Sequence, residues 1–427
     1  MKDGIKIGLL PVGDIDVTGT KEDLNTALKS LKRLKLDVID KPATSDPEEV
    51  NLFSKHLEKE EVCLLILFPL HGMQSANLVL AAERTELPVV IWALPVRYSF
   101  PTSASAIGNL RERGLRAKLV YGAPDAESAL NDILRASKAA YTIKMLREAR
   151  IGQIGVLQYS NVASNYDRYV LRDRLGPEIV QISINELTAS FNKITEEEVD
   201  REFEEISSRF PVEIDEADLK KAIKLHLAIK RLSEGYGLSG VTLECYTELG
   251  RIFCTNPCLG FIENMVIGCE GDVVQCVASL LVKYLTGKDV YAADIFSVDY
   301  DRSLLSLVHC SAPAALAEDP SKALVGAYRP PMTLGSYVMA VCKPQIPPGP
   351  VTIFRLFGKN LDKIHLTMGE LASYEFETAL KVNVKVTGNL KKFVENVSGN
   401  HYLLVPGDIK EELYELCDWL KIQMIET

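Results

Sequence analysis

The sequence predicts an α/β protein in which two doubly wound parallel-sheet (Rossmann-like) domains precede an antiparallel, β-barrel-like domain. The chain has 427 residues, which is more than one ordinary hydrophobic core contains. Apolar runs alternate with helical patterns through its first three hundred residues, and after residue 320 strands rich in β-branched residues alternate with Gly–Pro turns. We therefore expect domains at residues 1–148, 149–318 and 319–427.

In the first domain, strands are expected at residues 6–11, 36–39, 62–68 and 88–93, and helices at 21–36, 47–59 and 75–85. This alternation indicates a parallel sheet with helices on both faces. Ligands of such sheets bind at the carboxyl ends of the strands, where His71 is a candidate substrate-binding residue. No GxGxxG or GxxxxGK[ST] motif occurs at these ends, so no nucleotide cofactor is expected.

The second domain begins with the strand 150–157, after a long helical stretch. The loop 160–167 is rich in small polar residues, and further strands are expected at 179–184 and 240–245. A helix follows Asp272 and ends before Gly287. The helix dipole favours acids at its start, which explains Asp272 but accounts less well for Glu270, next to a glycine. Asp294 lies in the strand 291–298, and His309 lies near the end of the strand 304–310.

The third domain is expected to contain strands at 336–342, 351–357, 363–368 and 380–386, then a helix at 409–420 and a short final strand. His401 stands just before a strand and follows Asn400. Of the six histidines, His56, His226 and His365 are expected at the surface. Taken alone, His309 and His401 each fit a hydrogen-bonded core histidine or a metal ligand.

Two carboxylates and one of these histidines would suit a divalent cation with open positions for substrate oxygens. Such a carboxylate-rich set favours Mn²⁺, Mg²⁺ or Co²⁺ over structural zinc.

The net charge of −10 argues against nucleic-acid and anionic-membrane partners, which need a basic surface. No apolar run approaches the roughly 20 residues of a membrane span, and the N-terminus lacks a signal-peptide pattern. With nine cysteines expected to be reduced and buried, these features predict a cytoplasmic protein.

Several motifs together resemble the L-fucose isomerase and L-arabinose isomerase superfamily, in a short form. The resemblance spans most of the chain and is carried by Gly268–Asp272 with the helix after it, Ala293–Asp294, Val308–Cys310, and Gly399–His401 with Pro406–Asp408. It implies a metal held by Glu270, Asp294 and His401. It also implies that His309 is either a fourth ligand or an outer partner of these ligands.

The resemblance further implies a metal-dependent aldose–ketose isomerase that acts on an unphosphorylated sugar through an ene-diol intermediate. The chain is shorter than these isomerases and its N-terminal loops match them poorly, so a distant branch could act on another aldose, including a sulfonated sugar. Mn²⁺ (or Mg²⁺ or Co²⁺) would act as a Lewis acid, while Glu270 and Asp294 move the proton as general acid and base. Asn400 would bind a substrate hydroxyl, and a homo-oligomer, trimer or hexamer, is implied. Two alternatives remain open: a non-catalytic sugar-binding or sensing protein, and a metal-dependent sugar lyase that uses the same site.

Overall fold

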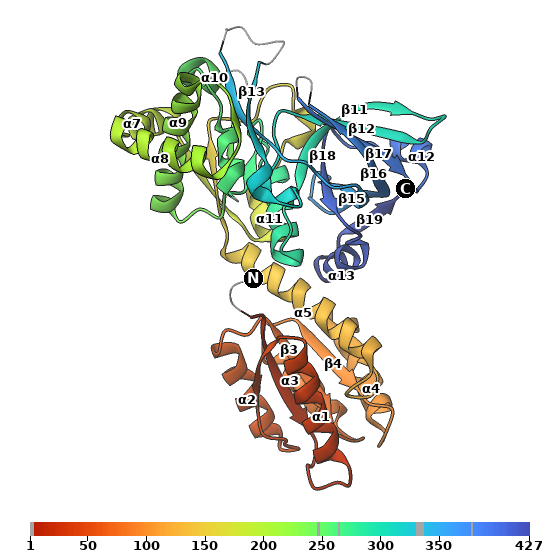
Figure 1. The fold of residues 1–427 in the computed structure, drawn as a ribbon. Helices are drawn as coiled ribbons and strands as arrows, with labels where there is room; N and C mark the ends of the chain where they lie inside the picture. Colours follow the sequence, from red (N-terminus) through yellow and green to blue (C-terminus); the bar gives the residue numbers. More distant parts are fainter. Residues whose placement is uncertain (1–3, 246–247, 264, 330–336, 377–378) are drawn as a thin grey trace. The chain divides into compact units, whose positions relative to one another are not determined.

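A computed structural model describes residues 4–245, 248–263, 265–329, 337–376 and 379–427 (Figure 1). The chain divides into two compact units, Met1–Lys144 and Met145–Thr427. The predicted division of the second unit at residue 318 stays a prediction. Among the described residues, no helix has both the length and the apolar character that crossing a bilayer requires.

The first unit contains a five-stranded parallel sheet with the strand order β2-β1-β3-β4-β5, as expected for a doubly wound domain. Its central strand β3 is buried along its whole length, which is why it reads as an unbroken apolar run. The elements are β1 (Lys6–Val12), α1 (Thr20–Arg33), β2 (Asp37–Asp40), α2 (Pro47–Lys59), β3 (Leu64–Pro69), α3 (Ser75–Glu83), β4 (Val89–Ala93), α4 (Ser99–Glu112), β5 (Ala117–Tyr121) and α5 (Glu127–Glu148). Helix α4 and strand β5 were not predicted, because the serine-rich α4 shows weak helical periodicity.

The second unit opens with a four-stranded parallel sheet of order β10-β9-β6-β7. Its strands are β6 (Arg150–Ile154), β7 (Glu178–Ile182), β9 (Gly240–Leu243) and β10 (Ile267–Gly268). The α-helices of this region are α6 (Arg168–Leu175), α7 (Ile184–Asn192), α8 (Glu196–Arg209), α9 (Glu216–Tyr236), α10 (Glu248–Phe253) and α11 (Val273–Thr286), with the 3₁₀ turns η1 (Val162–Ser164) and η2 (Pro257–Glu263). Helix α11 begins at the cap Asp272 and ends at Gly287, whose positive φ of 74° suits a glycine.

Six antiparallel strands close into a barrel in the order β15-β18-β11-β12-β17-β16, and β16 pairs back to β15. The predicted β-barrel-like architecture is therefore confirmed. The strands are β11 (Tyr291–Asp299), β12 (Leu304–His309), β15 (Gly349–Phe357), β16 (Lys363–Glu375), β17 (Leu380–Val386) and β18 (His401–Pro406), with β19 (Gln423–Glu426) added in parallel to β16 and the helices α12 (Leu390–Glu395) and α13 (Lys410–Leu420). Inward-facing apolar residues alternate along β17 and join the barrel core.

The barrel is assembled from segments on both sides of residue 319. Strands β11 and β12 precede that residue but pair with barrel strands, so Asp294 is part of the barrel sheet. The turns η3 (Ala314–Leu316) and η4 (Pro320–Lys322) then lead to β13 (Leu324–Tyr328) and β14 (Met339–Lys343). These two strands form a separate small sheet with β8 (Val212–Glu213). The strand expected at 336–342, which corresponds to β14, is therefore not a barrel strand, and β13 was not predicted.

Candidate metal centre

Glu270 lies in the short link between β10 and α11, at the carboxyl end of the parallel sheet. Its φ is 56° and that of Gly271 is 73°, so two successive residues adopt the left-handed conformation. Neighbouring strand ends hold this turn, because Gln158 N donates to Glu270 O over 2.9 Å and Gly271 N donates to Leu243 O over 2.8 Å. A left-handed conformation is unfavourable for a residue with a side chain, and such strain collects at functional sites. The turn directs the partly buried Glu270 side chain, 18% exposed, toward His401.

Asp272 performs two tasks with its two carboxylate oxygens. Oδ1 accepts from the backbone N of Gln275 and caps α11, as the sequence predicts. Oδ2 lies 3.0 Å from Nδ1 of His401 and also accepts from the Ser164 hydroxyl. Burial raises the pKa of the fully buried Asp272, but the hydrogen bond and charge of His401, with Arg355 and Ser164, hold it below its usual range. Asp272 is therefore an ionised carboxylate that accepts the Nδ1 proton of His401.

His401 and Asp294 are directly paired residues on the neighbouring barrel strands β18 and β11. Paired residues on antiparallel strands project to the same face, which brings the two side chains together. Nε2 of His401 lies 3.7 Å from Oε2 of Glu270 and 3.7 Å from Oδ1 of Asp294. This nitrogen is buried and has no hydrogen-bond partner in the part of the chain that the structure describes. The three residues thus converge although they come from three separate segments.

His309 ends β12, the strand next to β11, and contributes a fourth donor. Its ring centroid lies 5.7 Å from that of His401. One ligand atom each from Glu270, His309 and His401 lie within 4.8 Å of one another. Burial alone would lower the pKa of His309, but the adjacent Cys310 and the carboxylates of Asp294 and Glu270 raise it to about 10. These neighbouring groups therefore favour the protonated form of the His309 ring.

The donor set fits a divalent cation. A buried imidazole nitrogen without a partner is unfavourable, and a cation between Nε2 of His401 and the two carboxylates would satisfy it. An outer carboxylate on the other ring nitrogen, here Asp272, is the usual companion of a metal-binding histidine. Burial raises the pKa of Glu270, as expected for a carboxyl group that a charged partner would stabilise.

Three further residues organise the site, and the sequence pattern did not single them out. Asn161, fully buried, donates from Nδ2 to Oε2 of Glu270 over 3.1 Å. Arg355 donates to the carbonyl of His401 over 2.6 Å and to the hydroxyl of Ser164 over 3.0 Å. Two signals could have identified them: the small polar loop 160–167 at a strand end, and a single arginine within the apolar strand β15.

The two residues expected to bind substrate lie in different units. Asn400 is at the site, where its Nδ2 donates to Oδ1 of Asp294 over 2.8 Å. His71 belongs to the first unit, where its Nε2 accepts from the backbone N of Asp14 and its Nδ1 donates to the carbonyl of Gly72, each over 2.8 Å. A substrate-binding role for either residue stays a prediction.

A second cluster of possible ligands is formed by Glu202, His226 and Glu263. His226 was expected at the surface, but it is 1% exposed because its helix packs this face against η2. Its Nε2 lies 3.1 Å from Oε2 of Glu263, and Lys230 also pairs with that carboxylate. The hydrogen bond from His226, followed by its charge and by Lys230, lowers the pKa of Glu263 to about 2 against the effect of burial. His226, Lys230 and Glu263 therefore satisfy one another within this cluster.

Comparison with known proteins finds relatives along most of the chain. A sulfoquinovose isomerase of Priestia aryabhattai is 23% identical over 362 residues, which is 80% of this chain and 80% of that protein. A sulfoquinovose isomerase of Clostridium sp. (strain MSTE9) is 24% identical over 411 residues, or 88% of each chain. This chain is similar to sulfoquinovose isomerases. The similarity confirms the expected class of protein, an enzyme of the ketol-isomerase type.

Two other comparisons contribute little. No protein-family model matches the chain. A solute-binding protein of Actinobacillus succinogenes with bound D-allose is 12% identical and covers 67% of this chain and 93% of its own, at a TM-score of 0.20. A score this low carries no argument about the fold or the ligand.

Proposed function

We propose that the chain is a divalent-cation-dependent aldose–ketose isomerase that acts on an unphosphorylated sugar through an ene-diol intermediate. One observation carries the proposal. Nε2 of His401 is buried and unpaired between the carboxylates of Glu270 and Asp294, while Asp272 holds the opposite ring nitrogen. A sugar-binding protein has no need of this arrangement, whereas a cation held there would polarise the carbonyl group of a sugar.

Glu270, Asp294 and His401 would hold the cation, with His309 as a fourth ligand or an outer partner. The donor types favour Mn²⁺, Mg²⁺ or Co²⁺. When bound, the cation would supply Lewis-acid stabilisation of the negative charge that develops on the sugar oxygens. Asp272 would keep the Nδ1 proton on His401, so that its Nε2 lone pair stays directed at the cation position.

Proton transfer between C1 and C2 of the sugar would use the two carboxylates. Glu270 is the better general base, because its burial raises its pKa toward the working pH. Asn161 donates to Oε2 of Glu270 and fixes the orientation of the carboxylate plane. Asp294 is 36% exposed and accepts from Asn400, which leaves it accessible to a sugar hydroxyl group.

Sulfoquinovose is the first substrate to test, because the relatives are named for it. The experiment supplies sulfoquinovose, L-fucose and L-arabinose to protein loaded with Mn²⁺. It follows ketose formation and exchange of the C2 proton in D₂O by NMR. Isomer formation with C2 exchange supports the proposal, whereas binding without exchange for every sugar would favour a sensing protein.

Glu270→Gln provides the matched test of mechanism. Loss of a general base lowers kcat by about 10² to 10⁴-fold. Glu370→Gln is the control, since Glu370 is an exposed carboxylate on the barrel strand β16. Retained turnover in Glu270→Gln would remove Glu270 from the mechanism, and equal losses in both variants would indicate a general effect on folding.

A further inference from the structure

A pair of thiols lies beside the candidate metal centre and takes no part in the proposed proton transfer. Sγ of Cys258 is 3.5 Å from Sγ of Cys310. Cys310 directly follows His309, and its Sγ lies 3.4 Å from Nδ1 of that ring. The two cysteines come from different elements, η2 and the end of β12, 52 residues apart.

We propose that Cys258 and Cys310 form a disulfide on exposure to a hydroperoxide, and that this bond is a reversible modification site that switches off the neighbouring centre. The effect on activity rests on the proposed isomerase function, but formation of the bond does not. The sulfurs must approach by about 1.5 Å to reach the S–S distance of about 2.05 Å.

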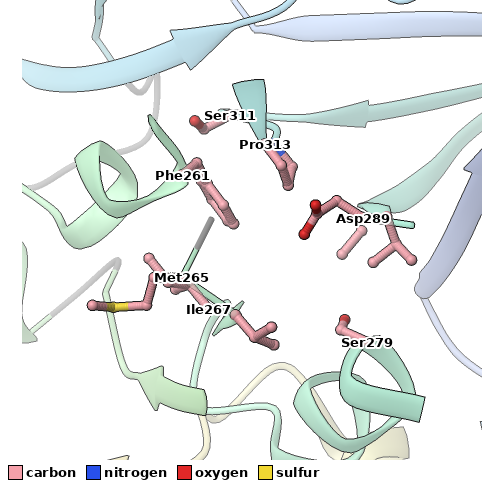
Figure 2. A pocket seen from close by; sticks show the side chains of 10 residues that line it. Phe261, Met265, Ile267, Ser279, Asp289, Ser311 and Pro313 are labelled. Carbon is pink, nitrogen blue, oxygen red and sulfur yellow. The ribbon is translucent and has the colours of Figure 1, made fainter. Parts of the chain in front are cut away.

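Accessibility and local packing favour this pair. Cys310 is partly exposed, whereas Cys258 is buried behind it, so the hydroperoxide meets Cys310 first. The segments that carry the two thiols also line a small cavity of about 20 Å³, to which Phe261 of η2 and Ser311 and Pro313 beyond β12 contribute (Figure 2). A cavity of this size holds about one water molecule, so a sugar does not fit. The geometric support for the disulfide is the 3.5 Å separation of the two sulfurs.

Formation of the Cys258–Cys310 disulfide takes two steps. The Cys310 thiol attacks the hydroperoxide, the O–O bond breaks, and the sulfur becomes a sulfenic acid while the peroxide is reduced to an alcohol or water. The Cys258 thiol then attacks the sulfenic sulfur, the S–S bond forms, and the hydroxyl leaves as water with the thiol proton. An external dithiol reverses the reaction.

The bond would alter the centre through His309. It would draw the Cys310 sulfur toward Cys258 and so change its 3.4 Å contact with Nδ1 of His309. Nδ1 of His309 contacts two sulfurs, that of Cys310 at 3.4 Å and that of Cys269 at 3.9 Å, and the closer one would move. The orientation of the imidazole would change, and its ligand atom lies within 4.8 Å of those of Glu270 and His401. Metal binding and turnover are therefore expected to fall together.

The test treats the full chain, without metal or sugar, with hydrogen peroxide at a small molar excess and maps disulfides by mass spectrometry of a non-reduced digest. The expected result is a Cys258–Cys310 crosslinked peptide that disappears with dithiothreitol. Absence of this peptide overturns the proposal, as does a different pair such as Cys245–Cys269, which also lie in contact. Because no substrate is needed, this result is independent of the proposed function.

Cys258→Ser removes one partner while keeping a polar group of similar shape beside Asn256, which contacts the Cys258 sulfur. Cys254→Ser is the matched control, because Cys254 is the exposed cysteine of the same region. In the loaded enzyme, peroxide is expected to lower the activity of the parent and of Cys254→Ser more than tenfold, with recovery in dithiothreitol. A reversible loss of the same size in Cys258→Ser would overturn the proposed switch.

Discussion

Oδ2 of Asp272 lies 3.0 Å from Nδ1 of His401, although the two residues are 129 positions apart. The carboxylate that begins α11 therefore also orients a histidine on the barrel strand β18. This contact couples the parallel-sheet region to the barrel and determines which nitrogen of His401 faces Glu270 and Asp294. Its removal is the most direct test of how the site is assembled.

Asp272→Asn is expected to weaken Mn²⁺ binding by about 10 to 100-fold, because the outer partner of His401 loses its charge. Asparagine is also a good helix cap, so α11 should remain folded. Asp167→Asn is the control, since Asp167 caps α6 through the backbone N of Tyr169 without contacting His401. Isothermal titration with Mn²⁺ measures both variants, and equal affinity in the two would contradict an orienting role for Asp272.

Gly271→Ala is expected to destabilise the protein by about 2–4 kcal/mol. A Cβ at this position would lie 2.2 Å from the Val156 carbonyl oxygen, and φ is 73°. Gly287→Ala is the matched comparison, because φ is 74° there but no atom lies within 4 Å of the added Cβ. Gly287→Ala should lower the free energy of unfolding by only about 1 kcal/mol, because the left-handed conformation is the only unfavourable feature at this position. Urea unfolding of both variants separates the steric clash from backbone strain, and similar losses would argue against the clash.

Asn161→Ala is expected to shift the acid limb of the pH–rate profile to higher pH. Burial already raises the pKa of Glu270, and the Asn161 amide stabilises its charged form by donating to Oε2. Removing this donor raises the pKa further, so Glu270 becomes deprotonated, and competent as a base, only at higher pH. Asn165→Ala, in the same loop but bonded to the Val162 carbonyl, should leave the profile unchanged. A drop in rate at all pH values without a shift would assign Asn161 a purely structural role.

His365 is expected to make the protein less stable below neutral pH. It is fully buried in the barrel, between the Tyr402 hydroxyl at 2.7 Å and the Thr427 hydroxyl at 3.2 Å, rather than facing solvent as its strand pattern suggested. Burial lowers its pKa from 6.5 to about 4. The unfolded chain therefore binds the proton more readily between these values, and stability falls as the pH decreases from about 6.5 to 4.

The expected loss in the free energy of unfolding due to His365 is about 3 kcal/mol between pH 7 and pH 4, measured by urea unfolding at several pH values. His365→Gln should flatten this dependence, because glutamine does not titrate and can still form a hydrogen bond. His56→Gln, at an exposed helix position, should retain the parent's dependence. If the free energy of unfolding of His365→Gln depended on pH as it does in the parent, the acid sensitivity would belong to other groups.

The sequence alone determined the elements whose signals are local. Apolar runs marked the parallel strands because both faces of such a sheet are buried, and the Asp272 cap with Gly287 marked both ends of α11. The motif resemblance also nominated Glu270, Asp294, His309 and His401 together, and the structure brings these four side chains into one neighbourhood.

The tertiary structure decided what depends on contacts between distant segments. Strand pairing placed Asp294 opposite His401, and packing of loop 160–167 against the barrel brought Asn161 to Glu270 and Ser164 to Asp272. Periodicity reports which face of an element is apolar, but it does not report which polar groups meet across elements. Burial then raised the pKa of Glu270 and lowered the pKa of His365. Sequence does not predict these shifts, because desolvation depends on the complete fold and not on neighbours in sequence.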